Sequence, residues 1–207
     1  MGDESGLRGI ELDHKVVASL ERSYIYLRHM NRNTVLDRHV HTIGFGGSCH
    51  WCMEAVFQSL RGVTQVQQGW IASDGEAQDF SEAVLVDYDP SVISLSDLVA
   101  IHLHTHSCTS DHPMRHKYRS AIYYLSRSQQ GQLPIILDSL QKDFDKRVIT
   151  KILPFVSFKI NKEEYINYFQ KNKENAFCKR YIHPKLKTLL AQFSTYVVKD
   201  LEAEIES

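Results

Sequence analysis

Strand-type and helix-type hydrophobic patterns interleave along this chain from residue 39 onwards, and that order restricts its fold more than any other feature. The clearest strand is 82–88, where alternate residues share a face. One face carries Glu82, Val84, Val86 and Tyr88, and the other carries Ala83 and Leu85. Since helical patterns lie between the strands and tight turns are few, the chain is predicted to form an α+β domain with two layers.

The other elements follow from the same periodicities. Strands are predicted at 40–45, 63–71, 118–125 and 148–159, the last interrupted by Pro154. Helices are predicted at 53–60, 94–102, 127–145, 161–170 and from Pro184 towards the C-terminus, with Pro134 weakening the first half of 127–145. Polar loops are predicted at 72–80, 105–117 and 172–183.

The length of 207 residues favours one domain with extensions. Residues 1–38 are predicted to be an N-terminal helical extension, with a helical pattern from His14 to His29. Residues 39–190 are predicted to form the main domain, and 191–207 a helical C-terminal tail.

Charge and hydropathy exclude several partners. The formal net charge is −1, so no strong attraction to nucleic acid or an anionic membrane is expected. No apolar run approaches the roughly 18 residues that a membrane helix needs, and the first 30 residues contain no secretory signal pattern. A cytoplasmic location is therefore expected. The counts that stand out are 4 cysteines and 11 histidines, which favour reactive thiols or a metal over structural disulfides.

Cys49 is the strongest candidate for a nucleophile. It follows a glycine turn, Gly46 and Gly47, and stands at the start of the helix, where main-chain N–H groups stabilise a thiolate. Cys52 lies one helical turn later, as expected of a resolving thiol. Other interpretations of the Cys-His-Trp-Cys pair are a buried apolar pair, a thioredoxin-type redox motif, or half of a zinc site.

Candidates elsewhere have two interpretations each. Glu82 at a strand start is either a desolvated general acid with a raised pKa or an exposed carboxylate. Tyr118 either donates its hydroxyl to a substrate or packs in the core. The loop cysteines Cys108 and Cys178 are expected to be accessible. A zinc site would need ligands from the run of His102, His104, His106 and Cys108, but on a helix these histidines are expected to point in different directions.

Taken in order, several motifs resemble the peptide methionine sulfoxide reductase A family. Residues 45–57 read Phe-Gly-Gly-Ser-Cys-His-Trp-Cys-Met-Glu-Ala-Val-Phe, similar to the family's glycine turn, Gly-Cys-Phe-Trp and helix-opening Glu. Residues 81–84 (Ser-Glu-Ala-Val), 118–123 (Tyr-Arg-Ser-Ala-Ile-Tyr) and 182–186 (Ile-His-Pro-Lys-Leu) are similar to further family segments. The resemblance covers about residues 40–190, and ordered motifs together are specific.

The resemblance implies a ferredoxin-like core within the two-layer αβ sandwich and thiol-dependent reduction of methionine-S-sulfoxide, free or peptide-bound. Cys49 would attack the sulfoxide sulfur and become a sulfenic acid, while Glu82 and Tyr118 would handle the oxygen. Trp51 would wall an apolar slot for the methyl group. Cys52, with Cys178 as a second possibility, would resolve the sulfenic acid, and thioredoxin or another dithiol would reduce the disulfide. No metal or other cofactor is implied.

The chain departs from the family at the site. Ser48 stands where the family has Gly, and His50 replaces the pocket-lining Phe, which makes the pocket more polar. The short 72–80 loop carries no counterpart of the family's oxygen-binding Tyr. The family's active-site Asp falls on Pro113, with Asp111 or His112 as substitutes. Two other functions stay open: a general thiol–disulfide redox protein or sensor using Cys49 and Cys52, and a zinc-binding module.

Overall fold

The computed structural model describes residues 40–206, which belong to one compact unit, His39–Ser207. The predicted N-terminal extension at 1–38, including its helix at 14–29, lies outside the described residues. The boundary at 190/191 stays a prediction, and helix α6 (His183–Phe193) runs across it. No helix in the described part of the chain is both long and apolar enough to cross a membrane.

Six strands form one mixed sheet in the order β5-β4-β1-β3-β2-β6. They are β1 (His41–Gly46), β2 (Val63–Ala72), β3 (Ser81–Tyr88), β4 (Ala121–Tyr124), β5 (Lys151–Pro154) and β6 (Ser157–Ile160). Only β4 and β5 pair in parallel, and the other four pairs are antiparallel. The predicted α+β class is confirmed.

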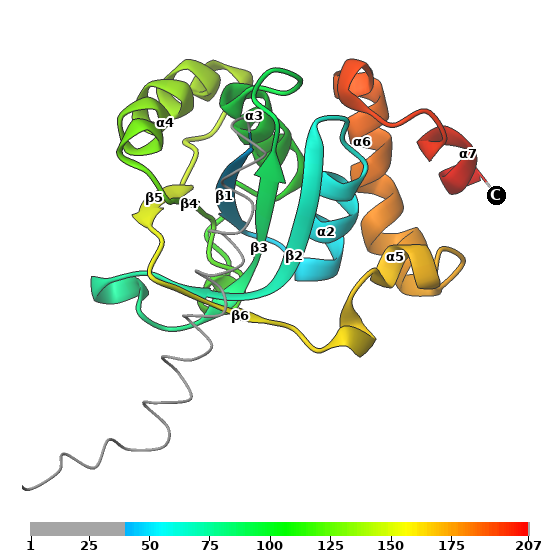
Figure 1. Cartoon of the computed structure of the whole chain (residues 1–207), viewed down its shortest axis with the longest axis horizontal. Helices are drawn as coiled ribbons and strands as arrows, with labels where there is room; N and C mark the ends of the chain where they lie inside the picture. The colour runs from blue at the N-terminus through cyan, green and yellow to red at the C-terminus, as the bar shows by residue number, and fades with distance from the viewer. Residues whose placement is uncertain (1–39, 207) are drawn as a thin grey trace, which may run out of the picture. The chain divides into compact units, whose positions relative to one another are not determined.

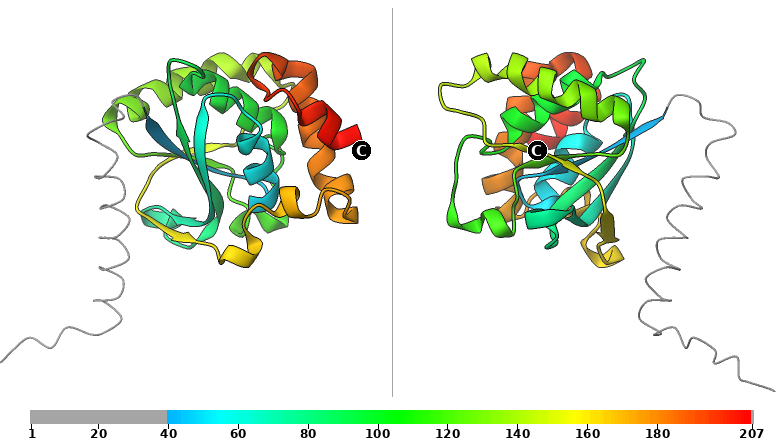
Figure 2. Two further views of the ribbon diagram at one scale, coloured as in Figure 1. Left: turned by 45° about the vertical axis from the view of Figure 1, so that its right-hand side comes forward. Right: turned by 90° about the vertical axis from the view of Figure 1, so that its left-hand side faces the viewer.

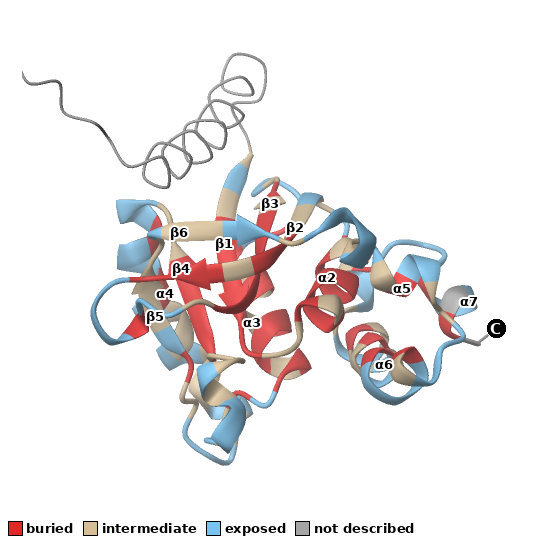
Figure 3. Ribbon diagram, turned by 90° about the horizontal axis from the view of Figure 1, so that it is seen from below, coloured by how far each residue is buried: buried red, intermediate tan, exposed pale blue. Residues whose placement is uncertain are grey.

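The helices gather on one side of this sheet (Figures 1 and 2). They are α2 (His50–Gln58), α3 (Leu95–Thr105), α4 (Arg127–Leu140), α5 (Tyr168–Lys171), α6 and α7 (Leu201–Glu206). Their apolar residues join those of β1 and β3 in one buried cluster, which includes Phe45, Phe57, Val84, Leu98 and Leu186. Figure 3 shows the buried residues concentrated in β1, β3, α2 and α3.

The central strand β3 has the predicted two-faced pattern, but both of its faces are buried. Val84, Val86 and Tyr88 pack in the helical core. Leu85, on the opposite face, is also buried. Glu82, at the start of β3, lies on the helix-facing side and therefore beside the first turn of α2.

The predicted strand 118–125 is shorter in the structure, because β4 begins only at Ala121. The residues before Ala121 form hydrogen bonds with the start of β3 and do not extend the pairing of β4 with β1. The N–H of Glu82 donates to the carbonyl of Lys117 (2.9 Å), and the N–H of Arg119 donates to the Ser81 hydroxyl (2.9 Å). Tyr118 is thereby held beside the beginning of β3.

The predicted strand 148–159 is two strands at opposite edges of the sheet, β5 and β6. Only Phe155 and Val156 separate them. The N–H of Phe155 donates to the carbonyl of Tyr124 on β4, and the N–H of Val156 donates to that of Ala72 on β2. Strands β4 and β2 therefore end close together, which a local pattern cannot reveal.

Three helical predictions also need correction. The 161–170 helix breaks at Asn167, whose φ of 57° is left-handed, into a 3₁₀ turn and α5. Pro134 leaves α4 intact through Leu140, since the carbonyl that it frees is on the exposed side of the helix. The final helix ends at Phe193 instead of running to the C-terminus, and the loop 172–183 contains a π-helical turn, Cys178–Ile182.

Phe45→Ala should strongly destabilise the fold. Phe45 is fully buried on β1 and stacks on Phe57 of α2 with ring centroids 4.7 Å apart. Loss of a buried aromatic ring costs about 3–5 kcal/mol of unfolding free energy, measurable by urea denaturation. Ile135→Ala on α4, where the side chain is 72% exposed, should cost less than about 0.5 kcal/mol. Equal losses in the two variants would contradict the assignment of the core.

Candidate active site

Cys49 lies where β1 turns into α2. It is the N-cap residue of α2, and its Sγ accepts a hydrogen bond from the N–H of Cys52 at 3.3 Å. The turn needs Gly47, whose φ of 144° is unfavourable for other residues, and an added Cβ there would strike the His106 ring. The Gly46 carbonyl accepts from His102 Nε2 (2.8 Å), so α3 fixes the turn from behind.

The two thiols of the Cys-His-Trp-Cys motif are in direct contact. The Cys49 thiol donates to the Cys52 sulfur, with the two Sγ atoms 2.7 Å apart. This hydrogen bond lowers the pKa of Cys52, and the same bond, together with burial, raises the pKa of Cys49. The first ionisation of the pair is therefore easier than the second, and after it one proton is shared between the two sulfurs.

Which sulfur carries the charge depends on where the shared proton lies. With the proton on Cys52, the negative charge sits on Cys49, where the N-cap position and the Cys52 N–H stabilise it. Cys49 is also partly accessible, whereas Cys52 is buried. Cys49 is thus the sulfur that a substrate can reach.

Glu82 is buried beside this pair, and the interpretation of an exposed carboxylate is wrong. Its side chain is 3% exposed. One oxygen, Oε2, accepts from the main-chain N–H of His50 (3.0 Å) and contacts His50 Nδ1. The other, Oε1, forms an ion pair with Lys117 Nζ at 3.2 Å. Glu82 therefore connects the first turn of α2 to the segment before β4.

The expected raised pKa of Glu82 is also wrong. Burial does raise the pKa, but the hydrogen bonds and charge of His50 and the hydrogen bond from Lys117 outweigh it, so the net shift is downward. Glu82 is consequently ionised in the resting protein. It acts as an acceptor that holds two donors in place.

His50 is held from both sides. Besides the Nδ1 contact with Glu82, its Nε2 lies 2.6 Å from Asn161 Nδ2. Asn161 also donates to Gln68 on β2 at 3.3 Å. The imidazole is buried and oriented by partners on two other elements. Its position allows it to fix the carboxylate.

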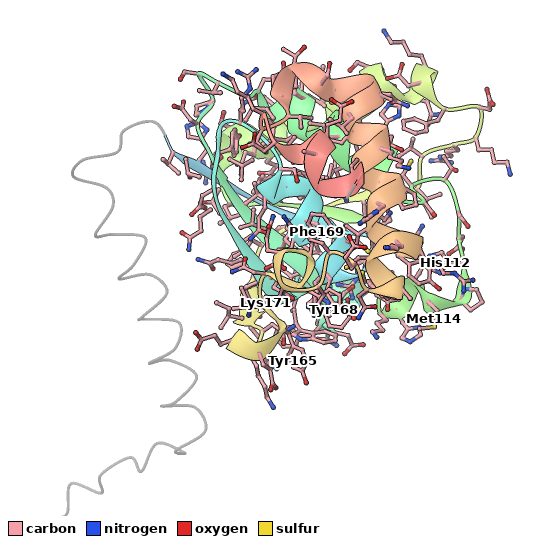
Figure 4. The ribbon with its side chains drawn as sticks, turned by 90° about the vertical axis from the view of Figure 1, so that its right-hand side faces the viewer. His112, Met114, Tyr165, Tyr168, Phe169 and Lys171 are labelled. Atoms are coloured by element: carbon pink, nitrogen blue, oxygen red, sulfur yellow. The ribbon has the colours of Figure 1, made fainter. Side chains whose placement is uncertain are left out.

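Trp51 forms an aromatic wall next to Cys49. Its ring stacks on Tyr168 of α5, with centroids 3.9 Å apart and planes 7° apart, and Phe177 meets it edge-on at 5.4 Å. Figure 4 shows Tyr165 and Tyr168 on the segment that includes α5. The buried Glu54 carboxylate holds this segment, since it accepts from the N–H groups of Asn167 (2.9 Å) and Tyr168 (3.2 Å).

The other candidates are placed unevenly around the site. Tyr118 lies against Lys117, whose Nζ is 5.1 Å from the ring centroid. Asp111 is exposed next to Arg115. In the described part of the chain, the hydrogen bonds and ion pairs of the Glu82 carboxylate are made with His50 and Lys117 and do not include Asp111. Cys108 and Cys178 are both buried, contrary to the expected accessibility. Burial and the charge of Cys52 both raise the pKa of Cys178.

The histidine run does not form a metal site. His102 and His106 stack with centroids 4.1 Å apart, because residues four apart share a helix face, so the expectation that all three diverge is wrong for this pair. His104 points instead to Asp143 and Phe144. Among the described residues, no group of three or more His, Cys, Asp or Glu side chains could hold a metal ion.

A family model, described as peptide methionine sulfoxide reductase, matches residues 41–196. The chain belongs to this family. The MsrA of Acinetobacter baumannii (strain SDF), named a peptide methionine sulfoxide reductase, is 32% identical over 171 residues, which cover 75% of this chain and 97% of that protein.

Solved structures show the same fold for this family member. Mxr1 from Saccharomyces cerevisiae in reduced form has a TM-score of 0.61 at 21% identity, covering 69% of this chain and 91% of that chain. Mxr1 in complex with Trx2 has a TM-score of 0.51 at 21% identity, covering 62% of this chain and 85% of that chain. The resemblance inferred from the motifs is confirmed.

Several residues of this reductase-family site gave no local signal. Asn161 lies 111 positions from His50, and Gln68 lies 93 positions from Asn161. Neither sits in a recognisable motif. Lys117 could have been noticed, because it directly precedes Tyr118 and follows a polar loop. Its role depends on the pairing of this segment with β3, which is a tertiary feature.

His50→Phe should raise the pKa of Glu82. The variant removes the side-chain hydrogen bond and the charge of His50, which lower this pKa, while burial, which raises it, stays together with the main-chain N–H and Lys117. In the wild type, the stabilising effect of the ionised carboxylate is lost only as pH falls through the low folded-state pKa. In the variant, that loss should begin at higher pH. The pKa can be measured by carbon-13 NMR titration of labelled Glu side chains, with Glu82→Gln assigning the signal.

His50→Gln is the matched control for that titration. The amide can still donate to Glu82 but cannot carry the imidazole's charge, so an intermediate pKa is expected. If Glu82 titrates at the same pH in wild type and in His50→Phe, the His50 side chain does not lower the pKa of Glu82.

Proposed function

We propose that this protein reduces methionine-S-sulfoxide, free or within peptides, to methionine. The observation that carries the proposal is the accessible Cys49 at a helix start, in contact with Cys52 and beside the buried Glu82 network. A nucleophilic sulfur, a second thiol and a set of polar groups for the oxygen are what thiol-dependent sulfoxide reduction requires. Membership of the peptide methionine sulfoxide reductase family supports the same reaction.

The chemistry balances within the proposed site. The Cys49 sulfur attacks the sulfoxide sulfur, the sulfur–oxygen bond of the substrate breaks, and the oxygen remains on Cys49 as a sulfenic acid. Thiol and sulfoxide thus become sulfenic acid and sulfide. The proton shared by the two cysteines is the one that ends on the oxygen. Methionine leaves, and the Cys52 thiolate then attacks the sulfenic sulfur to form the disulfide. The sulfur–oxygen bond breaks, and the departing hydroxide takes a proton from solvent to become water.

Glu82 is the proposed relay for that proton. A carboxylate that is ionised at rest can accept a proton from the groups around it and pass it to the departing oxygen. Tyr118 is the proposed hydrogen-bond donor that holds the oxygen. Asp111 is also proposed to bind substrate. Because it is exposed and does not contact Glu82 or its partners, its loop has to move for this role.

The substrate's methyl group is proposed to lie against Trp51. The stack of Trp51 on Tyr168 gives an apolar surface next to the nucleophile. His50 adds a polar edge to the same pocket, with its ring 5.8 Å from Trp51. A pocket that combines both surfaces suits a sulfoxide, which is polar at oxygen and apolar at its carbon substituents.

Cys52 is the proposed first resolving thiol because it already contacts Cys49, whereas Cys178 is buried and must move. Thioredoxin is the proposed reductant of the disulfide, and the yeast relative Mxr1 forms a complex with Trx2. No metal or other cofactor takes part in these steps. A cytoplasmic location is proposed because these thiols need a reducing environment.

We also assign the core topology to the ferredoxin-like type. Strands β4, β1, β3 and β2 are neighbours in that order and all pair antiparallel. Helices α2 and α3 follow β1 and β3 along the chain. This βαββαβ arrangement supports a two-layer core, to which β5, β6 and the later helices are added.

A coupled assay with thioredoxin and each epimer of a methionine sulfoxide substrate tests the function. The wild type should reduce the S epimer. Cys49→Ser should abolish turnover, and Glu82→Gln should lower kcat by about 100-fold or more because the proton relay is lost. Turnover of disulfides without any of sulfoxide would favour a general thiol–disulfide protein, a rival that the Cys49–Cys52 contact also suits.

The resolving step is tested by mapping disulfides after one turnover. Protein treated with the sulfoxide substrate and no reductant should contain a Cys49–Cys52 bond, found by mass spectrometry of its peptides. Cys52→Ser should still release one methionine per chain but stop before thioredoxin-dependent cycling. Cys108→Ser is the control, since Cys108 is buried without a proposed role. A predominant Cys49–Cys178 bond in the wild type would assign the first resolving step to Cys178.

A further inference from the structure

Reduction of a sulfoxide places negative charge on the substrate oxygen as the sulfur–oxygen bond breaks. Donors or cations at that position lower the barrier, provided that they are already in place before the reaction. The donors around Glu82 are the main-chain N–H of His50, the His50 imidazole and the Lys117 ammonium. They differ in how many hydrogens they can still offer to a ligand.

The His50 donors are already used by protein partners. Its N–H and Nδ1 both face Glu82 Oε2, and its Nε2 accepts from Asn161 Nδ2, so it offers no donor there. A substrate could gain a bond from His50 only at the expense of one of these. The surroundings of the imidazole therefore suit it to holding Glu82 and not to binding the oxygen directly.

Lys117 is different in both geometry and exposure. An ammonium has three donor hydrogens. Nζ pairs with Glu82 Oε1 at 3.2 Å and also hydrogen-bonds with Tyr118, which leaves one hydrogen for a ligand. Its side chain is 40% exposed, in contrast to the 3% of Glu82, so a ligand can approach it from solvent. Nζ also lies 5.1 Å from the ring centroid of Tyr118, the proposed oxygen-holding residue.

The main chain holds Lys117 in this place. Its carbonyl accepts from the N–H of Glu82 (2.9 Å) and from the Ser81 hydroxyl (2.9 Å). The lysine is thus tied to the first two residues of β3 by backbone and side chain together. An ordered position before the substrate arrives is what electrostatic stabilisation requires.

We propose that Lys117 is a further catalytic residue, whose ammonium donates a hydrogen bond to the sulfoxide oxygen and stabilises the charge that develops there. This rests on the proposed function. Hydrogen bonding with Tyr118 and with Glu82 raises the pKa of Lys117, so the ammonium stays charged at neutral pH. Lys117 keeps its proton throughout, and the proton that ends on the oxygen still comes from the thiol pair.

The test is methionine release in a single turnover without reductant, which isolates sulfoxide cleavage from disulfide recycling. Lys117→Met should slow this step by about 100-fold, the cost of removing one oxyanion donor. Because the interaction belongs to the transition state, kcat and kcat/KM should fall together. Lys117→Arg should retain most of the rate, since it restores a cation. Lys187→Met, which removes an exposed lysine from α6, is the matched control and should match the wild type.

Lys117→Gln separates charge from simple positioning of Glu82. A glutamine amide can donate to the carboxylate, so a positioning role alone would leave Lys117→Gln as active as Lys117→Arg, and that result would overturn the proposal. A rate for Lys117→Met within about twofold of wild type would overturn it as well. If the wild type releases no methionine, the proposed function itself is wrong. If the wild type releases methionine and the Lys117 variants release it at the same rate, only the role proposed for Lys117 is wrong.

Discussion

The buried charge of Glu82 is the constraint on which the arrangement of the site depends. A carboxylate with 3% exposure would be very unfavourable without partners. Its partners come from two separate segments, His50 on α2 and Lys117 before β4. Each oxygen of the carboxylate is assigned to one segment. The helix start that carries Cys49 and the loop that carries Tyr118 are consequently held at fixed distances from the same group.

That constraint extends outward through polar contacts. Asn161, just after β6, lies on the far side of His50 and is bonded to Gln68 on β2. Gln68 donates in turn to Glu54 at 3.0 Å, and Glu54 holds the N–H groups that open α5. The aromatic residue that covers Trp51, Tyr168, is thus positioned by a chain of hydrogen bonds that ends at Glu82. Buried polar networks of this kind are stabilising only when their members are satisfied together.

Local patterns predicted the parts of this site but not how they are connected. The glycine turn before Cys49 and the alternation from Glu82 to Tyr88 are encoded in adjacent residues, so both could be read from the sequence. The ionisation state of Glu82 could not be read in this way, because it depends on His50 and Lys117, which are 32 and 35 positions away in the sequence. The division of 148–159 into β5 and β6 likewise depends on acceptors at Tyr124 and Ala72. The accessibility of Cys178 was mispredicted for the same reason, since its polar neighbours in sequence say little about the packing of the π-helical turn Cys178–Ile182 against α2.

The replacement of an apolar side chain by His50 changes what the carboxylate can do. In a purely apolar pocket, burial alone would act on Glu82 and favour the protonated acid. With His50 and Lys117 on its two oxygens, the carboxylate stays ionised, so it cannot supply a proton of its own at the outset. In the proposed mechanism, the proton for the oxygen therefore comes from the cysteine pair and reaches the oxygen through Glu82. His50 keeps Glu82 charged, and the role proposed for Lys117 is to supply the positive charge beside the oxygen that the carboxylate cannot.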